Sequence, residues 1–285
     1  MNTKKRIILL VAFSAILTAL VVWIVWGNTA LELNTYTITS SRLPESFDSY
    51  RIAHVSDLHN TQMGTDNEKL LTILREANPD MIAITGDLID SRNTNVDIAL
   101  QFVKDAVKIA PCYYVAGNHE ARVNAYSELK NGLISADVIV LEDASVEVGI
   151  DGKTITLIGV NDPSFETDYL IGDSETVMRS KLSELHTDGD GFTILLSHRP
   201  ELFDTYVDYD LDLILSGHAH GGQFRIPFLG GVVAPNQGFF PEFDAGIYTE
   251  KNTSMLVSRG VGNSIVPFRV NNRPEVILIE LISNE

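Results

Sequence analysis

Asp, Asn and His residues recur at the ends of short apolar runs along this chain of 285 residues. The groups are, in order, Asp57-Leu58-His59, Gly86-Asp87, Gly117-Asn118-His119-Glu120, His198 and Gly217-His218-Ala219-His220. Separations of 30, 31, 80 and 20 residues divide their leading members Asp57, Asp87, Asn118, His198 and His218. Carboxylate, amide and imidazole donors without a thiolate suit Mn²⁺, Fe, Zn²⁺ or Mg²⁺. The sequence therefore predicts a divalent-metal site built from five distant segments.

Each motif alone is weak evidence, because a single Asp-x-His or His-x-His is more often a surface or satisfied core feature, and Asn118 alone would be a turn residue. The inference depends on the position that all five share, at the end of a predicted strand. Of the 7 histidines, five lie in these motifs. We interpret His54 as a strand residue and His186 as a solvated helix end.

The elements that must position these groups alternate between strand and helix patterns. Apolar, β-rich runs predict strands at 51–56, 81–85, 113–116, 138–141, 154–160, 192–197 and 211–216, and amphipathic patterns predict helices near 70–74 and over 96–109. This alternation is typical of a sheet covered by helices. Ligands bind outside the carboxyl ends of such strands, so we expect the five groups at one edge. Residues two apart in a strand-like stretch point the same way, so Asp57/His59 and His218/His220 can each address one site.

Later segments look more purely β. A hairpin is expected between 146–150 and 154–160 around Asp151-Gly152, and the predicted strands 255–258 and 276–281 have no helical pattern between them.

We expect four regions: a basic tail at 1–6, a membrane anchor at 7–26, a linker with an edge strand at 27–48, and a catalytic domain at 49–285.

The N-terminal segment has the composition of a membrane span. After Lys4, Lys5 and Arg6, the 20 residues from Ile7 to Trp26 have only Ser14 and Thr18 as polar members. At about 1.5 Å per residue this helix would reach about 30 Å, the thickness of the hydrocarbon layer. A cleaved signal peptide is the alternative, but its apolar core is usually shorter. The positive-inside rule predicts a single-pass protein of the cell membrane with an extracytoplasmic catalytic domain.

Composition excludes several classes. Hydrophobic residues make up 45% and charged residues 21%, as in ordinary globular proteins. The net charge of -17 repels phosphate backbones, which argues against binding of a nucleic acid duplex. The single cysteine, Cys112, cannot form an internal disulfide, and we interpret it as a small buried hydrophobe.

The ordered series of motifs resembles the calcineurin-like metallophosphoesterase superfamily over about residues 50–285. The run Gly217–Gln223, followed by Phe224-Arg225-Ile226-Pro227, resembles more narrowly its membrane-associated bacterial branch, the YkuE- and YaeI-like phosphodiesterases. The resemblance implies an α/β (α+β) fold, a two-sheet β-sandwich flanked by helices, and hydrolysis of phosphodiester, phosphomonoester or pyrophosphate bonds by a metal-bridging hydroxide. It also implies a phosphoester substrate near the membrane or cell wall, for which we expect a lipid-linked or cell-envelope compound.

The resemblance further implies seven metal ligands for two divalent ions. They form one set for each ion and one bridging carboxylate: Asp57, His59 and His220; Asn118, His198 and His218; and Asp87 as the bridge. His119 matches a catalytic histidine that is not a ligand. Glu120 stands where many relatives have Asp.

Several features of the sequence allow two interpretations. The Phe-, Gly- and Pro-rich segment 224–248 either contacts lipid or packs on the sandwich. Arg199 and Arg225 either contact phosphate or form ordinary ion pairs, and segment 258–263 is a candidate site-lining loop. The alternative function is a non-catalytic envelope receptor or scaffold in which metals only hold the loops.

Overall fold

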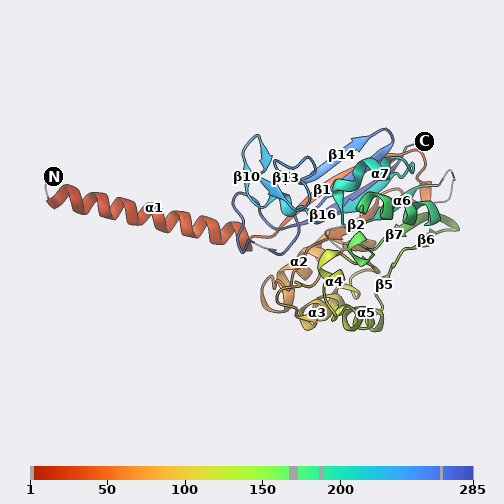
Figure 1. The fold of residues 1–285 in the computed structure, drawn as a ribbon, viewed down its shortest axis with the longest axis horizontal. Coiled ribbons are helices and arrows are strands. Elements are labelled where there is room, and N and C mark those ends of the chain that lie inside the picture. The colour runs from red at the N-terminus through yellow and green to blue at the C-terminus, as the bar shows by residue number, and fades with distance from the viewer. Residues whose placement is uncertain (1–2, 167–172, 186–188, 190, 264–265, 285) are drawn as a thin grey trace.

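The protein folds as a sandwich of two six-stranded sheets, seen in a computed structural model that describes residues 3–166, 173–185, 189, 191–263 and 266–284 (Figure 1). The first sheet has the order β1 (Glu32–Ser40), β16 (Glu275–Ser283), β2 (Tyr50–Val55), β3 (Met81–Thr85), β4 (Cys112–Val115) and β5 (Ile139–Val140). The second has the order β14 (Gly246–Glu250), β15 (Thr253–Val257), β9 (Leu213–Ser216), β8 (Thr193–Leu196), β7 (Lys153–Gly159) and β6 (Ala144–Ile150).

Helices cover both outer faces of the sandwich. The first sheet packs against α2 (Glu68–Ala77), α3 (Val96–Ala106) and α5 (Tyr126–Ser135), and the second against α6 (Ser174–Leu185) and α7 (Phe203–Val207). Buried aliphatic residues of both sheets, including Ile52 and Leu213, form the layer between them. The predicted α/β (α+β) sandwich flanked by helices is therefore confirmed.

Local sequence explains these elements. The leucines of α2 at 70, 71 and 74 are buried on one face, as in an amphipathic helix. The Asn95 side chain caps α3 by accepting a hydrogen bond from the Asp97 amide at 3.1 Å. Within the sheets, β2, β3 and β4 run parallel, as do β7, β8, β9 and β15, so their carboxyl ends collect at shared edges.

Every predicted strand overlaps an observed one, and the predicted hairpin is the antiparallel pair of β6 and β7. Beyond Gly222 the described residues contain only strands as regular elements. They include four very short ones that the sequence did not predict: β10 (Arg225–Ile226), β11 (Gly230–Gly231), β12 (Val233–Ala234) and β13 (Gly238–Phe239). The remaining short elements are α4 (Asn118–Ala121) and single-turn 3₁₀ helices at Glu45–Phe47, Thr65–Asn67, Pro163–Phe165, Pro200–Leu202 and His220–Gly222.

Helix α1 (Thr3–Thr29) contains the predicted apolar span and extends away from the sandwich (Figure 1). None of its described residues is buried, and it is long and apolar enough to cross a membrane.

Two histidines lie outside the metal-ligand motifs. His54 is buried on β2, where its Nε2 lies 2.7 Å from Thr85 Oγ1, whereas His186 lies outside the described residues.

Candidate metal centre

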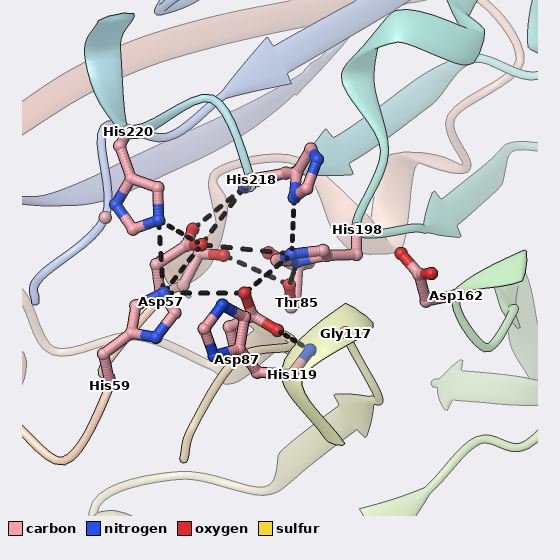
Figure 2. Close-up of polar contacts among 12 residues, drawn as sticks. Asp57, His59, Thr85, Asp87, Gly117, His119, Asp162, His198, His218 and His220 are labelled. Atoms are coloured by element: carbon pink, nitrogen blue, oxygen red, sulfur yellow. Dashed lines mark hydrogen bonds and ion pairs between the residues drawn. The ribbon is translucent and has the colours of Figure 1, made fainter. Parts of the chain in front are cut away.

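Seven of the eight predicted site residues converge at one end of the sandwich, between the two sheets (Figure 2), and the eighth, Asn118, is buried directly before His119. Asp57, Asp87 and Asn118 follow β2, β3 and β4 of the first sheet. His198 and His218 follow β8 and β9 of the second sheet. The expectation of one sheet edge was therefore wrong in this respect, because the edges of two facing sheets form the site together.

Asp57, His59 and His220 form a first buried group with donor atoms close enough to share one ion. Nε2 of His220 lies 3.3 Å from Oδ1 of Asp57 and 3.1 Å from Nε2 of His59. Figure 2 shows both imidazole rings directed at the Asp57 carboxylate.

Asp87, His198 and His218 form the second group. Nε2 of His198 lies 3.2 Å from Oδ2 of Asp87 and 3.2 Å from Nδ1 of His218. The same Oδ2 atom of Asp87 lies 3.5 Å from Nε2 of His59 in the first group. Asp87 therefore stands between the two groups, where a carboxylate shared by two ions must lie.

Unpartnered polar atoms test whether cations fit here. Among the described residues, Oδ1 of Asn118 is buried with no hydrogen-bond partner, and so are the Nδ1 atoms of His59 and His220. Buried polar atoms normally have a partner, so the Asn118 oxygen needs an explanation, whereas the two histidines meet in the first group through Nε2 and not through Nδ1. For Asn118 the explanation is direct, because its neutral oxygen is a suitable ligand for the ions that this donor set favours.

The charges of the buried side chains also favour a bound cation. Burial alone would raise the pKa of Asp57 and Asp87, but nearby histidines hold both well below the ordinary range. Burial would lower the pKa of His198, yet Asp87 and Asp57 raise it to about 10. Two buried carboxylates thus hold a proton on His198 when no other cation is near. A divalent ion would take over that compensation.

Hydrogen bonds fix which ring atom each histidine of the second group presents. Nδ1 of His198 lies 2.7 Å from the Thr85 carbonyl oxygen, which can only accept, so Nδ1 donates and Nε2 is left for a metal. Nε2 of His218 lies 3.2 Å from Oδ1 of Asn236, which leaves Nδ1 facing the site. Such outer contacts orient metal ligands and set their tautomers.

The backbone of the ligand loops is not strand-like, which corrects the expected geometry. Positive φ angles occur at Asp57 (53°), His59 (45°), Asp87 (53°), His218 (65°) and His220 (48°). Non-glycine residues seldom adopt this left-handed region, and they gather at functional sites. His218 and His220 consequently diverge and enter different groups, whereas Asp57 and His59 stay together.

Gly117 shows how closely these loops approach. A Cβ atom at this position would overlap the Asp87 carboxylate and would lie 2.7 Å from the Asp87 amide nitrogen. The loops after β3 and β4 can therefore meet only because residue 117 has no side chain.

His119 lies beside the first group, with its ring centroid 4.5 Å from that of His59. Its Nδ1 accepts a hydrogen bond from the Ser91 amide at 3.0 Å, so the neutral ring carries its proton on Nε2. Burial lowers the pKa of His119 to about 4.

Asp90 also lies at the site, with its carboxylate 4.0 Å from Nδ1 of His119 and 3.8 Å from Nδ1 of His59. Sequence reasoning missed Asp90, although its spacing three residues after Asp87 was a usable signal.

Glu120 holds two of the ligand loops together. Its carboxylate accepts hydrogen bonds from the amides of Asp87 (2.8 Å), Ile89 (3.1 Å) and Gly117 (2.8 Å). Burial raises the pKa of Glu120 to about 7. It ties the loops after β3 and β4 together, and a shorter Asp at this position would lack one methylene of reach.

The two arginines form ion pairs. Arg199 is buried against Asp162 and also pairs with Glu201 at 3.1 Å, and Arg225 pairs with Asp244 at 3.0 Å.

Segment 258–263 packs against the loop that carries Asp57, because Val261 and Gly262 donate backbone hydrogen bonds to the carbonyls of Ser56 and Asp57. An open depression of about 330 Å³ beside the first group is lined by His59, Asn60, Asp90, Arg92 and Asn93.

One part of segment 224–248 packs on the sandwich, and another part is exposed. Phe243 packs on Phe203, with ring centroids 5.5 Å apart, and belongs to the outer core of the second sheet. Phe228 and Phe239 instead are 106% and 78% exposed.

The family profile of calcineurin-like phosphoesterases matches residues 50–222, and the chain belongs to this family. It is a metal-dependent phosphoric ester hydrolase of the metallophosphoesterase type. The metallophosphoesterase YkuE of Bacillus subtilis is 30% identical over 262 residues, covering 89% of this chain and 86% of YkuE. The phosphodiesterase YaeI of Escherichia coli is 26% identical over 241 residues, covering 82% of each chain. A transmembrane protein with metallophosphoesterase domain from Danio rerio is 28% identical over 256 residues, covering 86% of this chain and 56% of that protein.

Proposed function

We propose that this chain is a membrane-anchored phosphoesterase that holds two divalent ions through seven ligands: Asp57, His59, Asp87, Asn118, His198, His218 and His220. The position of Asp87 between the two ligand groups carries the proposal, since its Oδ2 lies within 3.5 Å of a ligand nitrogen in each. Two such ions, drawn from Mn²⁺, Fe, Zn²⁺ and Mg²⁺, would activate water and offset the charge of the phosphoryl oxygens.

The residues around the ligands supply the remaining chemistry. His119 carries a hydrogen on Nε2 and can donate a hydrogen bond from it to the leaving oxygen of the substrate, which stabilises the charge that develops there, while Ser91 and Asp90 hold the ring in place. Loss of one such hydrogen-bond donor to developing charge costs about 10²–10³-fold in rate. The ligand side chains are nearly inaccessible to solvent, so their charges would interact with a bound cation more strongly than they would in water.

The substrate we propose is a phosphoester of a lipid or of the cell envelope. The relative YaeI is named a phosphodiesterase, which favours a diester as the first compound to assay. With a net charge of -17, the surface does not attract free phosphoanions, so a membrane tether would bring enzyme and substrate together.

We propose that α1 is a retained membrane span with Lys4–Arg6 on the cytoplasmic side and the sandwich outside the cytoplasm. Its length and exposed apolar surface support the span, and the basic residues before it support the orientation. Protease added to intact spheroplasts should digest the sandwich, whereas a digest that requires detergent would place the domain inside.

Hydrolysis of an aryl phosphodiester by the full chain in detergent tests the catalytic proposal. The chelator-treated chain should be inactive and should regain activity with at least one of the four ions. Inactivity toward diester, monoester and pyrophosphate probes with every ion would contradict it. Metal binding without any hydrolysis would instead favour the receptor or scaffold.

A further inference from the structure

The most exposed apolar side chains outside α1 gather at one end of the sandwich. Among the described residues, ten large hydrophobic side chains outside α1 are exposed, and six of them belong to two neighbouring segments: Ile226, Phe228, Leu229, Phe239, Phe240 and Phe268. We call these six the apolar end. Four of its members, Phe228, Phe239, Leu229 and Phe240, are exposed by 63% or more, whereas Ile134 on α5 reaches 51%.

Hydrogen bonds and an aromatic contact connect the apolar end to the base of α1. Oδ1 of Asn28, in the last turn of α1, accepts from the amide of Arg269 at 2.7 Å, and Nδ2 donates to the Arg269 carbonyl at 3.0 Å. The adjacent Phe268 packs on Phe224 with ring centroids 5.6 Å apart, and the Arg225 amide donates to the Val270 carbonyl at 3.0 Å. Figure 1 shows β10 and β13 on the side of the sandwich from which α1 leaves.

The base of α1 is fixed to the domain. The guanidinium of Arg273 lies 4.7 Å from the ring centroid of Trp26 and donates to the Ala30 carbonyl at 2.8 Å. Two residues after α1, the chain enters β1, which pairs along its whole length with β16. The helix and the apolar end therefore keep one relative orientation. Trp23 and Trp26 place this base at the depth of a membrane interface.

We infer that the apolar end rests in the interface of the bilayer that α1 spans, in the leaflet on the side of Trp26. This inference rests on the membrane anchoring proposed above and deepens it. Residues 28–285 carry a net charge of -20, so anionic headgroups would repel the domain and apolar burial must hold this surface.

The same segment reaches the metal centre. Asn236 lies in the turn between β12 and β13 and contacts Nε2 of His218, while Phe239 and Phe240 follow three and four residues later at the apolar end. One short hairpin thus joins a second-group histidine to the membrane-facing surface. The substrate class that this arrangement fits is an amphiphile whose phosphoester lies at the interface while its apolar part stays in the leaflet.

Depth measurement in vesicles tests the inference. The full chain is reconstituted in phosphatidylcholine vesicles containing nitroxide-labelled lipids, with a fluorophore on Phe239→Cys or, as a second position, Phe228→Cys. Ile134→Cys is the matched control, and the native Cys112 is buried. We expect lipid quenching at 239 and 228 that places both labels about 5–10 Å into the headgroup and acyl boundary, and little quenching at 134.

Equal quenching at all three positions, or none at 239 and 228, would overturn the inference. Carbonate extraction of the same vesicles shows whether α1 is inserted, and failure there would contradict the anchoring as well. Aryl phosphodiester hydrolysis by the labelled Ile134→Cys chain reports the catalytic proposal separately, because position 134 on α5 lies outside both the metal centre and the apolar end.

Discussion

Nε2 of His59 and Nε2 of His220 lie 3.1 Å apart, although 161 positions separate the two residues in the chain. Two imidazole nitrogens at this distance need a shared proton or a shared cation, because their lone pairs otherwise repel. Both rings are buried, and both Nε2 atoms lie within 3.7 Å of Oδ1 of Asp57. This is the arrangement that we expect of two ligands of one ion.

Replacing Asp87 by Asn should remove most of the activity and weaken metal retention. The neutral amide cannot offset two cations, so we expect at least a 100-fold loss, beyond the roughly 10–100-fold typical of outer-shell changes. Metal content after gel filtration and aryl diester hydrolysis measure both effects. Asp105→Asn on α3 is the control and should match the native chain. Native metal content in Asp87→Asn would contradict the shared carboxylate.

Replacing His119 by Ala should lower hydrolysis by about 10²–10³-fold while leaving metal content unchanged. In our proposal the ring donates a hydrogen bond to the leaving oxygen and stabilises its charge, so the defect should shrink as the leaving group becomes more acidic. A series of aryl phosphodiesters measures that dependence. A defect independent of the leaving group would show that His119 acts only as a structural element, and unchanged activity would remove it from catalysis.

Replacing Gly117 by Ala should disturb the centre although it changes no donor. The added methyl group would overlap the Asp87 carboxylate, so we expect lower metal content and lower activity together. Gly191→Ala is the matched control, since a Cβ there meets nothing within 4 Å. Normal metal binding by Gly117→Ala would mean that the loops after β3 and β4 lie further apart than described here.

Acid should destabilise the metal-free chain through His54. Burial lowers its pKa to about 3, below its ordinary value of 6.5, so between these values the unfolded chain binds a proton that the folded chain does not. Stability therefore falls as the pH drops below about 6.5. Relative to His54→Gln, the native chain should lose up to about 3 kcal/mol between pH 7 and pH 4, at about 1.4 kcal/mol per pKa unit. Urea unfolding in chelator measures this, and a pH-independent difference would contradict it.

The sequence predicted the strands that carry the donors because each is a continuous apolar run ending in Gly, Asp, Asn or His. It could not show that the five strand ends belong to two sheets, since facing edges meet only after the sandwich closes. The left-handed backbone at Asp57 and His220 is set by loop packing and leaves no periodic signal. Glu120 was noticed only as a variation, because its three amide partners come from two different loops. Strands as short as β10–β13 have too few residues for any pattern.

Metal titration of the chelator-treated full chain, with bound ions and aryl diester hydrolysis measured on the same samples, tests whether two ions bind and act together. We expect saturation at about two divalent ions per chain, with full activity only when both are bound. Saturation at one ion or none, or activity that is independent of added metal, would contradict it.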